Sequence, residues 1–119
     1  MGFLQSLVGA SSLNYDSLLA RTIAALPNTR IILGEPFLLP AGKFKDGYPA
    51  KIAELKKRQE VVARLAAKYN PPLIRYQQLF DEALKRAPAE FWCWNGVHPH
   101  YAGHGLMAEE WIKTVATLR

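Results

Sequence analysis

One short apolar run constrains the fold of this chain most. Residues 30–34 (RIILG) lie between Pro27 and Pro36 and show no alternation of apolar and polar side chains. That pattern is typical of a buried parallel strand whose two faces are both covered. Residues 73–76 form a second, shorter run of the same kind after two prolines. We therefore expect two parallel strands.

Helical patterns surround both runs. Residues 14–26 carry one apolar stripe behind a plausible N-cap at Asn14, residues 50–69 form the longest amphipathic stretch, and 78–86 and 101–118 fit further helices. Residues 38–49, which hold two prolines and two glycines, predict a loop. Helix, strand, helix, strand, helix is the order of a parallel α/β sheet with right-handed crossovers.

The domain organisation follows from length and from one small-residue tract. At 119 residues the chain is one domain at most. Residues 9–12 (GASS) indicate a break, so we predict an N-terminal extension over 1–13 and a single domain over 14–119. Two strands leave an open sheet edge on residues 30–34, and such an edge tends to pair with another chain. We expect a homo-oligomer formed through that exposed edge.

Composition excludes several classes of protein. Half of the residues are hydrophobic and 21% are charged, as in globular rather than disordered chains. No apolar run approaches the roughly 20 residues of a membrane-spanning helix, and residues 1–13 lack the basic start of a signal peptide. With one cysteine there is no internal disulfide, so a cytoplasmic location is plausible. The net charge of +5 comes without a recognition motif, and we predict no specific nucleic-acid binding.

The residues that carry chemistry lie in one block, residues 92–99 (WCWNGVHP). His98 is held between a glycine-containing turn and Pro99, which restricts its backbone. Asn95 lies three residues upstream, close enough for its side chain to reach the imidazole. A side-chain oxygen on one ring nitrogen would fix the tautomer and leave the other nitrogen free to take a proton. His98 is therefore the candidate general base and Asn95 the residue that orients it, although a structural histidine at a helix entry is the simpler alternative.

This block resembles the C-terminal signature of the SGNH (GDSL) serine hydrolases, in which an Asp-x-x-His-Pro sequence carries the catalytic acid and base. The likeness runs from about residue 14 to the C-terminus and includes residues 31–37 (IILGEPF), which resemble a strand of that family. The resemblance implies a three-layer α/β/α, flavodoxin-like sandwich of which this chain holds the last two strands. It also implies an esterase acting on acyl or acetyl esters, without a cofactor.

The chain departs from that family in two ways. Asn95 replaces the family's aspartate, and an amide does not stabilise imidazolium as a carboxylate does. The family's Gly-Asp-Ser nucleophile block, oxyanion glycine and Gly-x-Asn-Asp block have no counterpart here. Ser11 and Ser12 are the candidate nucleophiles in this chain, whereas Cys93 is expected to point into the core.

Other chemistries have less support. His98, His100 and His104 are three potential metal ligands, but the carboxylates or thiolates of a zinc site are missing, and we predict no metal. Two functions remain open. The chain is either an esterase of small esters with incomplete machinery, or a non-catalytic association module that keeps the hydrolase half-fold.

Overall fold

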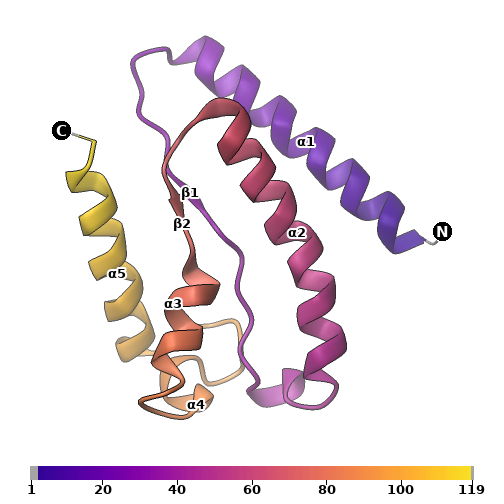
Figure 1. Cartoon of the computed structure of the whole chain (residues 1–119), viewed down its shortest axis with the longest axis vertical. Coiled ribbons are helices and arrows are strands. Elements are labelled where there is room, and N and C mark those ends of the chain that lie inside the picture. Colours follow the sequence, from indigo (N-terminus) through magenta and orange to yellow (C-terminus); the bar gives the residue numbers. More distant parts are fainter. Residues whose placement is uncertain (1–2, 119) are drawn as a thin grey trace.

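A computed structural model describes residues 3–118 of the chain, with side chains from residue 12 onward (Figure 1). Over this range the fold contains short parallel strands and mostly helical connections. In chain order the elements are α1 (Phe3–Ala25), β1 (Leu33–Gly34), the 3₁₀ turn η1 (Gly42–Phe44), α2 (Tyr48–Tyr69), β2 (Leu73–Ile74), α3 (Tyr76–Ala83), α4 (Ala89–Trp92) and α5 (Tyr101–Ala116).

The sheet is parallel, as predicted. Leu33 pairs with Leu73, and Gly34 pairs with Ile74. Backbone hydrogen bonds continue the ladder on both sides, from the Leu33 N–H group to the Pro72 carbonyl and from the Glu35 N–H group to the Ile74 carbonyl, each 2.9 Å long. The strands are shorter than the apolar runs because Pro72 has no N–H group for the ladder at one end and α3 begins at Tyr76 at the other.

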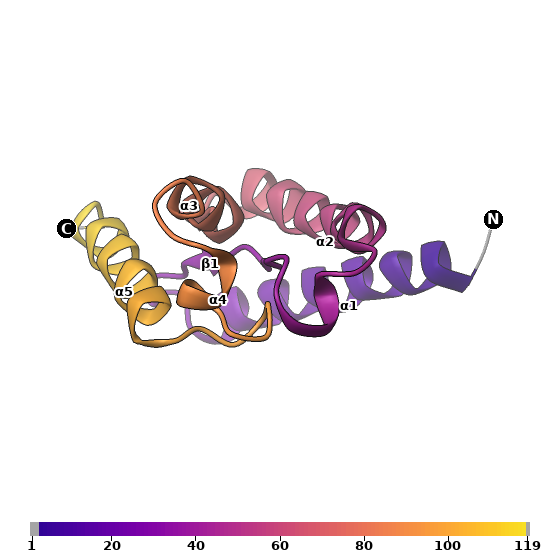
Figure 2. The ribbon, with the colours of Figure 1, turned by 90° about the horizontal axis from the view of Figure 1, so that it is seen from below.

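Helices cover both faces of the strands. Seen from below, α2 and α3 form one layer and α1, α4 and α5 the other, with β1 between them (Figure 2). This arrangement is a partial three-layer α/β/α sandwich and confirms the predicted fold class. None of the helices described is long and apolar enough to cross a membrane.

The helix α2 is positioned by its apolar face and by its ends. Its buried residues, Val61, Val62 and Leu65, pack in one core cluster with Leu19 of α1 and Leu33 of β1. The helix ends at Asn70, whose φ of 64° is left-handed, and whose N–H group donates to the Ala66 carbonyl. Asparagine tolerates this conformation better than most residues, and the two prolines that follow prevent a further turn.

The helix α1 differs from the prediction. The break expected at residues 9–12 and the N-cap expected at Asn14 are wrong, because α1 runs without interruption from Phe3 to Ala25. Glycine and serine lower helix propensity by about 1 kcal/mol or less each, and no proline is present to stop the helix. The helix is held against α2 by Asp16, which accepts hydrogen bonds from Tyr69 and, at 2.7 Å, from Lys68.

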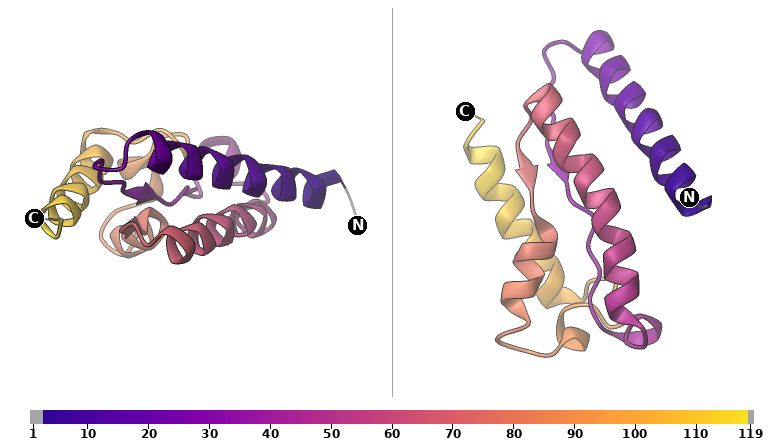
Figure 3. Two further views of the ribbon diagram at one scale, coloured as in Figure 1. Left: turned by 90° about the horizontal axis from the view of Figure 1, so that it is seen from above. Right: turned by 45° about the vertical axis from the view of Figure 1, so that its right-hand side comes forward.

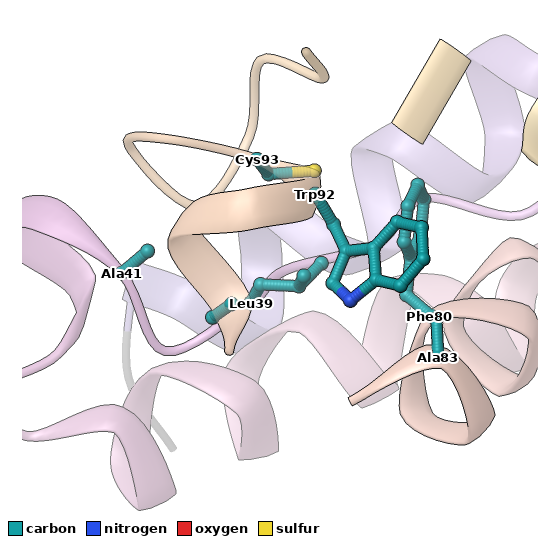
Figure 4. Packing of buried hydrophobic residues seen from close by; sticks show 7 residues of the cluster. Leu39, Ala41, Phe80, Ala83, Trp92 and Cys93 are labelled. Carbon is teal, nitrogen blue, oxygen red and sulfur yellow. The ribbon is translucent and has the colours of Figure 1, made fainter. Parts of the chain in front are cut away.

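A second core cluster lies beyond the carboxyl ends of the strands. It joins Leu39 and Ala41 from the segment after β1, Phe80 and Ala83 from α3, and Ala89, Trp92 and Cys93 at α4 (Figure 4). Phe80, Leu39 and Cys93 are completely buried. The sequence analysis did not predict α4. This short helix brings Trp92 and Cys93 into the cluster and so fixes the start of the loop that carries His98.

Candidate active site

The loop from Cys93 to Pro99 is a closed turn. Cys93 and Pro99 form an antiparallel bridge, and the Gly96 N–H group donates to the Cys93 carbonyl at 3.1 Å. Just outside the turn, the His100 N–H group donates to the Trp92 carbonyl at 2.8 Å. The residues between these bonds, Asn95 to His98, therefore have little conformational freedom.

This loop lies directly on the segment that follows β1. The Leu39 N–H group donates to the Gly96 carbonyl at 2.9 Å. Gly96 has a φ of 93°, and a Cβ atom there would lie 2.7 Å from the Leu39 carbonyl oxygen, so only glycine fits. The contact places Asn95 and His98 beyond the carboxyl ends of the parallel strands, where ligand crevices form in open α/β sheets.

The side chain of Asn95 has a defined orientation. Its Oδ1 atom accepts hydrogen bonds from the backbone N–H groups of Val97 (3.1 Å) and His98 (2.9 Å). Because backbone N–H groups only donate, the oxygen of the amide must face them. The Nδ2 group is then directed at the imidazole and lies 2.6 Å from His98 Nδ1. The two side chains thus meet as expected, but the expectation that the side-chain oxygen bonds the ring is wrong, because that oxygen is taken by the two backbone N–H groups and the amide nitrogen faces Nδ1.

That contact selects a tautomer. An amide NH₂ group can only donate, so Nδ1 of His98 must accept and the proton of the neutral ring sits on Nε2. A carboxylate at the same position would instead accept from a protonated Nδ1. The ring is exposed to solvent. In this tautomer, Nε2 can donate a hydrogen bond outward but has no lone pair with which to accept a proton.

A buried polar network supports this region and was not predicted from the sequence. The Glu35 carboxylate is 8% exposed and accepts a hydrogen bond from the Gln77 N–H group at 3.1 Å. The Gln77 side chain binds both backbone groups of Leu38, at 2.8 and 3.0 Å. One feature of the sequence could have indicated this network: Glu35 directly follows the apolar run of residues 30–34. A carboxylate that is buried at the end of a strand requires hydrogen-bond donors from its neighbours.

Two adjoining clefts open beside the loop. One, of about 530 Å³, is lined by residues of α1, β1, α2, α3 and α5, and the other, of about 500 Å³, lies between α2 and the segment around Phe44. Phe37, Arg58 and Val97 line both clefts. Val97 directly precedes His98, so both clefts lie next to the loop of the candidate base, although His98 itself lines neither. Their walls are mostly apolar.

The structure does not join the predicted nucleophiles to His98. Ser12 lies half-buried on α1 and forms no hydrogen bond with Asn95 or His98 among the described residues, while the Ser11 side chain lies outside the described part of the chain. Cys93 is completely buried, and burial raises the pKa of its thiol to about 11. Since the thiolate is the nucleophilic form, Cys93 is inert at neutral pH.

The histidines do not form a metal centre. Within residues 3–118, no three side chains of His, Cys, Asp or Glu gather at one point. His100 precedes α5 and His104 lies on its first turn, and both are exposed.

Solved structures similar to this chain are hydrolases. A GDSL-like lipase from Parabacteroides merdae is 33% identical, with a TM-score of 0.81 over 92% of this chain and 50% of its own. The acetylxylan esterase Axe2 from Geobacillus stearothermophilus is 26% identical, with a TM-score of 0.72 over 91% of this chain and 47% of its own. LAE5, an α/β hydrolase from the metagenome of Lake Arreo, Spain, is 23% identical with a TM-score of 0.71, which shows the fold alone.

Two further facts about these solved structures bear on the candidate site: how much of their length this chain matches, and which residues are replaced in the catalytic mutants. The chain spans about half the length of the solved structures it matches. Catalytic mutants of Axe2 replace a serine, an aspartate or a histidine, and the aspartate and histidine are three positions apart, as Asn95 and His98 are here. No protein-family model and no curated protein matches the chain.

Proposed function

Since this chain carries the fold of the C-terminal half of the SGNH (GDSL) hydrolases, we propose that it supplies the histidine side of an esterase site. The observation that supports the proposal is the 2.6 Å contact between Asn95 Nδ2 and His98 Nδ1 at the carboxyl ends of the strands. The relatives include acetylxylan esterases. The substrates we propose are therefore small carboxylic esters, acetyl esters first.

His98 acts in this proposal through Nε2. To serve as general base it must take the proton of an attacking hydroxyl, which requires the tautomer with the proton on Nδ1. Asn95 opposes that tautomer, because its amide donates to Nδ1. In serine proteases, replacing the orienting aspartate by asparagine lowers kcat about 10⁴-fold for this reason. In this proposal His98 is a weak general base. The side chain at position 95 decides how much of the ring is in the tautomer that can take a proton.

We propose that the nucleophile is a serine that the described residues do not bring to His98. Ser11 and Ser12 remain the candidates within this chain, but Ser12 is not bonded to the His98 loop in the part of the chain described. Hydrolysis would follow the general course of acyl transfer. A serine oxygen attacks the ester carbonyl as His98 takes its proton, and the ring then returns that proton to the leaving alcohol.

Complementation tests this function. The chain would be mixed with the serine-bearing half of the GDSL-like lipase, the half that it does not match, and hydrolysis of a chromogenic acetyl ester would be followed. We expect slow turnover with the wild type, faster turnover with Asn95→Asp, and none with His98→Ala. Equal turnover by the Asn95→Asp and His98→Ala variants, with both mixtures forming the same complex, would remove His98 from the mechanism.

The alternative function is an association module without catalysis. The observation that favours it is the edge of β1 that faces away from β2, which pairs with no strand among the described residues. We predict that another chain pairs with this edge, a second copy being the simplest partner. Light scattering of dilute protein tests that form of the prediction, since a stable monomer would exclude the second copy.

A further inference from the structure

The pair Asn95-Gly96 is chemically reactive. In such a pair the glycine nitrogen can attack the side-chain amide carbon of the asparagine, because glycine has no Cβ atom to hinder the approach. Of the four asparagines of the chain, only Asn95 precedes a glycine. The pair lies between α4 and α5, at the end of the molecule where the chain passes from β1 through η1 into α2 (Figure 3, right). Because the same loop carries His98, a change at position 95 alters the candidate site directly.

The reaction is an intramolecular acyl transfer followed by hydrolysis. The Gly96 nitrogen forms a bond to Cγ of Asn95, the bond between Cγ and Nδ2 breaks, and Nδ2 leaves as ammonia with the proton of the Gly96 nitrogen. Water then opens the cyclic imide. Addition of water to Cγ breaks its bond to the Gly96 nitrogen and gives aspartate, whereas addition to the backbone carbonyl carbon gives isoaspartate. Flexible Asn-Gly peptides form mostly isoaspartate.

The turn places hydrogen-bond donors on one of the two carbonyl groups of Asn95. The side-chain oxygen accepts from the backbone N–H groups of Val97 at 3.1 Å and of His98 at 2.9 Å. Two donors directed at one oxygen stabilise the negative charge that develops there when water adds to the carbon. This arrangement favours attack on Cγ and therefore aspartate.

The backbone carbonyl group of Asn95 lies against η1 instead. A Cβ atom on Gly42 would lie 3.3 Å from the Asn95 carbonyl oxygen and 3.4 Å from its carbon. Among the described residues no backbone N–H group donates to this oxygen. Isoaspartate would also lengthen the backbone of a turn that the bridge between Cys93 and Pro99 closes. Both features disfavour the isoaspartate product.

The same turn limits the rate. The Gly96 N–H group donates to the Cys93 carbonyl at 3.1 Å, and this bond must break before the nitrogen attacks. We therefore expect the reaction to follow a local opening of the loop. It should be slower in the folded protein than in the unfolded chain.

We propose that Asn95 is a self-modification site, and that the fold directs its conversion to aspartate. The new carboxylate would keep both backbone donors. It would also accept from a protonated Nδ1 of His98, the atom to which the amide now donates at 2.6 Å. The product therefore has the carboxylate–imidazole pair that the unmodified chain lacks. The conversion does not rest on the proposed esterase function, and only its effect on ester hydrolysis does.

Mass spectrometry of incubated protein tests the proposal without any ester. The intact mass should rise by about one mass unit, because an amide becomes a carboxylate. Fragmentation of the peptide that contains Asn95 should show more aspartate than isoaspartate. The same protein in urea should convert faster and give mostly isoaspartate. Isoaspartate as the major product of the folded protein, or an unchanged mass after several weeks, would overturn the proposal.

Two controls locate the reaction. Asn28 is exposed but precedes Thr29, whose branched side chain hinders attack, and it should stay unmodified. Asn95→Gln should show no gain in mass, because the longer side chain cyclises far more slowly. An equal gain in Asn95→Gln and the wild type would place the reaction elsewhere and overturn the proposal. If the mass changes as expected but aged protein hydrolyses ester no faster in the complementation assay, the modification stands and the proposed esterase function fails.

Discussion

The side chain of Gln77 holds the backbone of Leu38 by both of its polar groups. Gln77 Oε1 accepts from the Leu38 N–H group at 2.8 Å, and Gln77 Nε2 donates to the Leu38 carbonyl at 3.0 Å. The next residue, Leu39, donates to the Gly96 carbonyl. The start of α3 thereby fixes the segment after β1, and that segment fixes the loop of His98.

The first prediction concerns this buried pair of bonds. Replacing Gln77 by Met keeps the length of the side chain but leaves the buried Leu38 N–H group without a partner, whereas the Leu38 carbonyl still accepts from the Tyr48 hydroxyl at 2.8 Å. One unsatisfied buried group costs about 1–3 kcal/mol, so the free energy of unfolding should fall by about that amount in urea titrations. The adjacent Gln78 is exposed, and Gln78→Met should change stability by less than about 0.5 kcal/mol. Equal effects of the two substitutions would contradict the role of Gln77.

The second prediction compares two glycines of α5. A Cβ atom on Gly103 would lie 2.3 Å from the Trp92 carbonyl oxygen, whereas a Cβ atom on Gly105 meets nothing within 4 Å. Gly105→Ala should stabilise the helix by about 0.5–1 kcal/mol, because alanine has the higher helix propensity. Gly103→Ala should destabilise the protein, because α5 must move away from Trp92. Thermal unfolding of both variants measures the difference, and a rise in Tm for Gly103→Ala would refute the close packing.

The third prediction concerns the tautomer of His98. Long-range ¹H–¹⁵N spectra of the neutral ring should show the proton on Nε2 in the wild type, because Asn95 donates to Nδ1. In Asn95→Asp the proton should move to Nδ1, because a carboxylate only accepts. The exposed ring of His100 serves as an internal control and should be unchanged. A proton on Nδ1 in the wild type would mean that the amide does not direct its Nδ2 group at the ring.

The fourth prediction is a loss of stability at alkaline pH. Burial raises the pKa of the Cys93 thiol from its ordinary value of 9.0 to about 11. Above pH 9 the unfolded chain releases this proton while the folded chain keeps it, so folding becomes less favourable as pH rises from about 9 to about 11. The pH dependence of unfolding should therefore be steeper in the wild type than in Cys93→Ala. Parallel curves for the two proteins would show that the thiol does not contribute.

The sequence alone determined both strands, most of the helices, and the pair of residues that meet in the site. Apolar periodicity located α2 and α5 to within two residues of their bounds, since a helix that buries one face must repeat its apolar positions. The contact between the side chains of Asn95 and His98 could be predicted from their separation of three residues and from the turn around them. Residues three apart in a tight turn are neighbours wherever that turn lies in the fold. Residues 92–99 also pointed to the hydrolases that the structure resembles.

Only the tertiary structure decided how these local elements act together. The orientation of the Asn95 amide depends on two backbone N–H groups of the turn, and no pattern of residue types encodes that choice. The anchoring of Leu38 by Gln77 joins residues 39 positions apart, and α1 continues through residues 9–12 although local propensity predicted a break. Such features arise from contacts between distant segments, whose free energies depend on the assembled fold rather than on neighbouring residues in the chain.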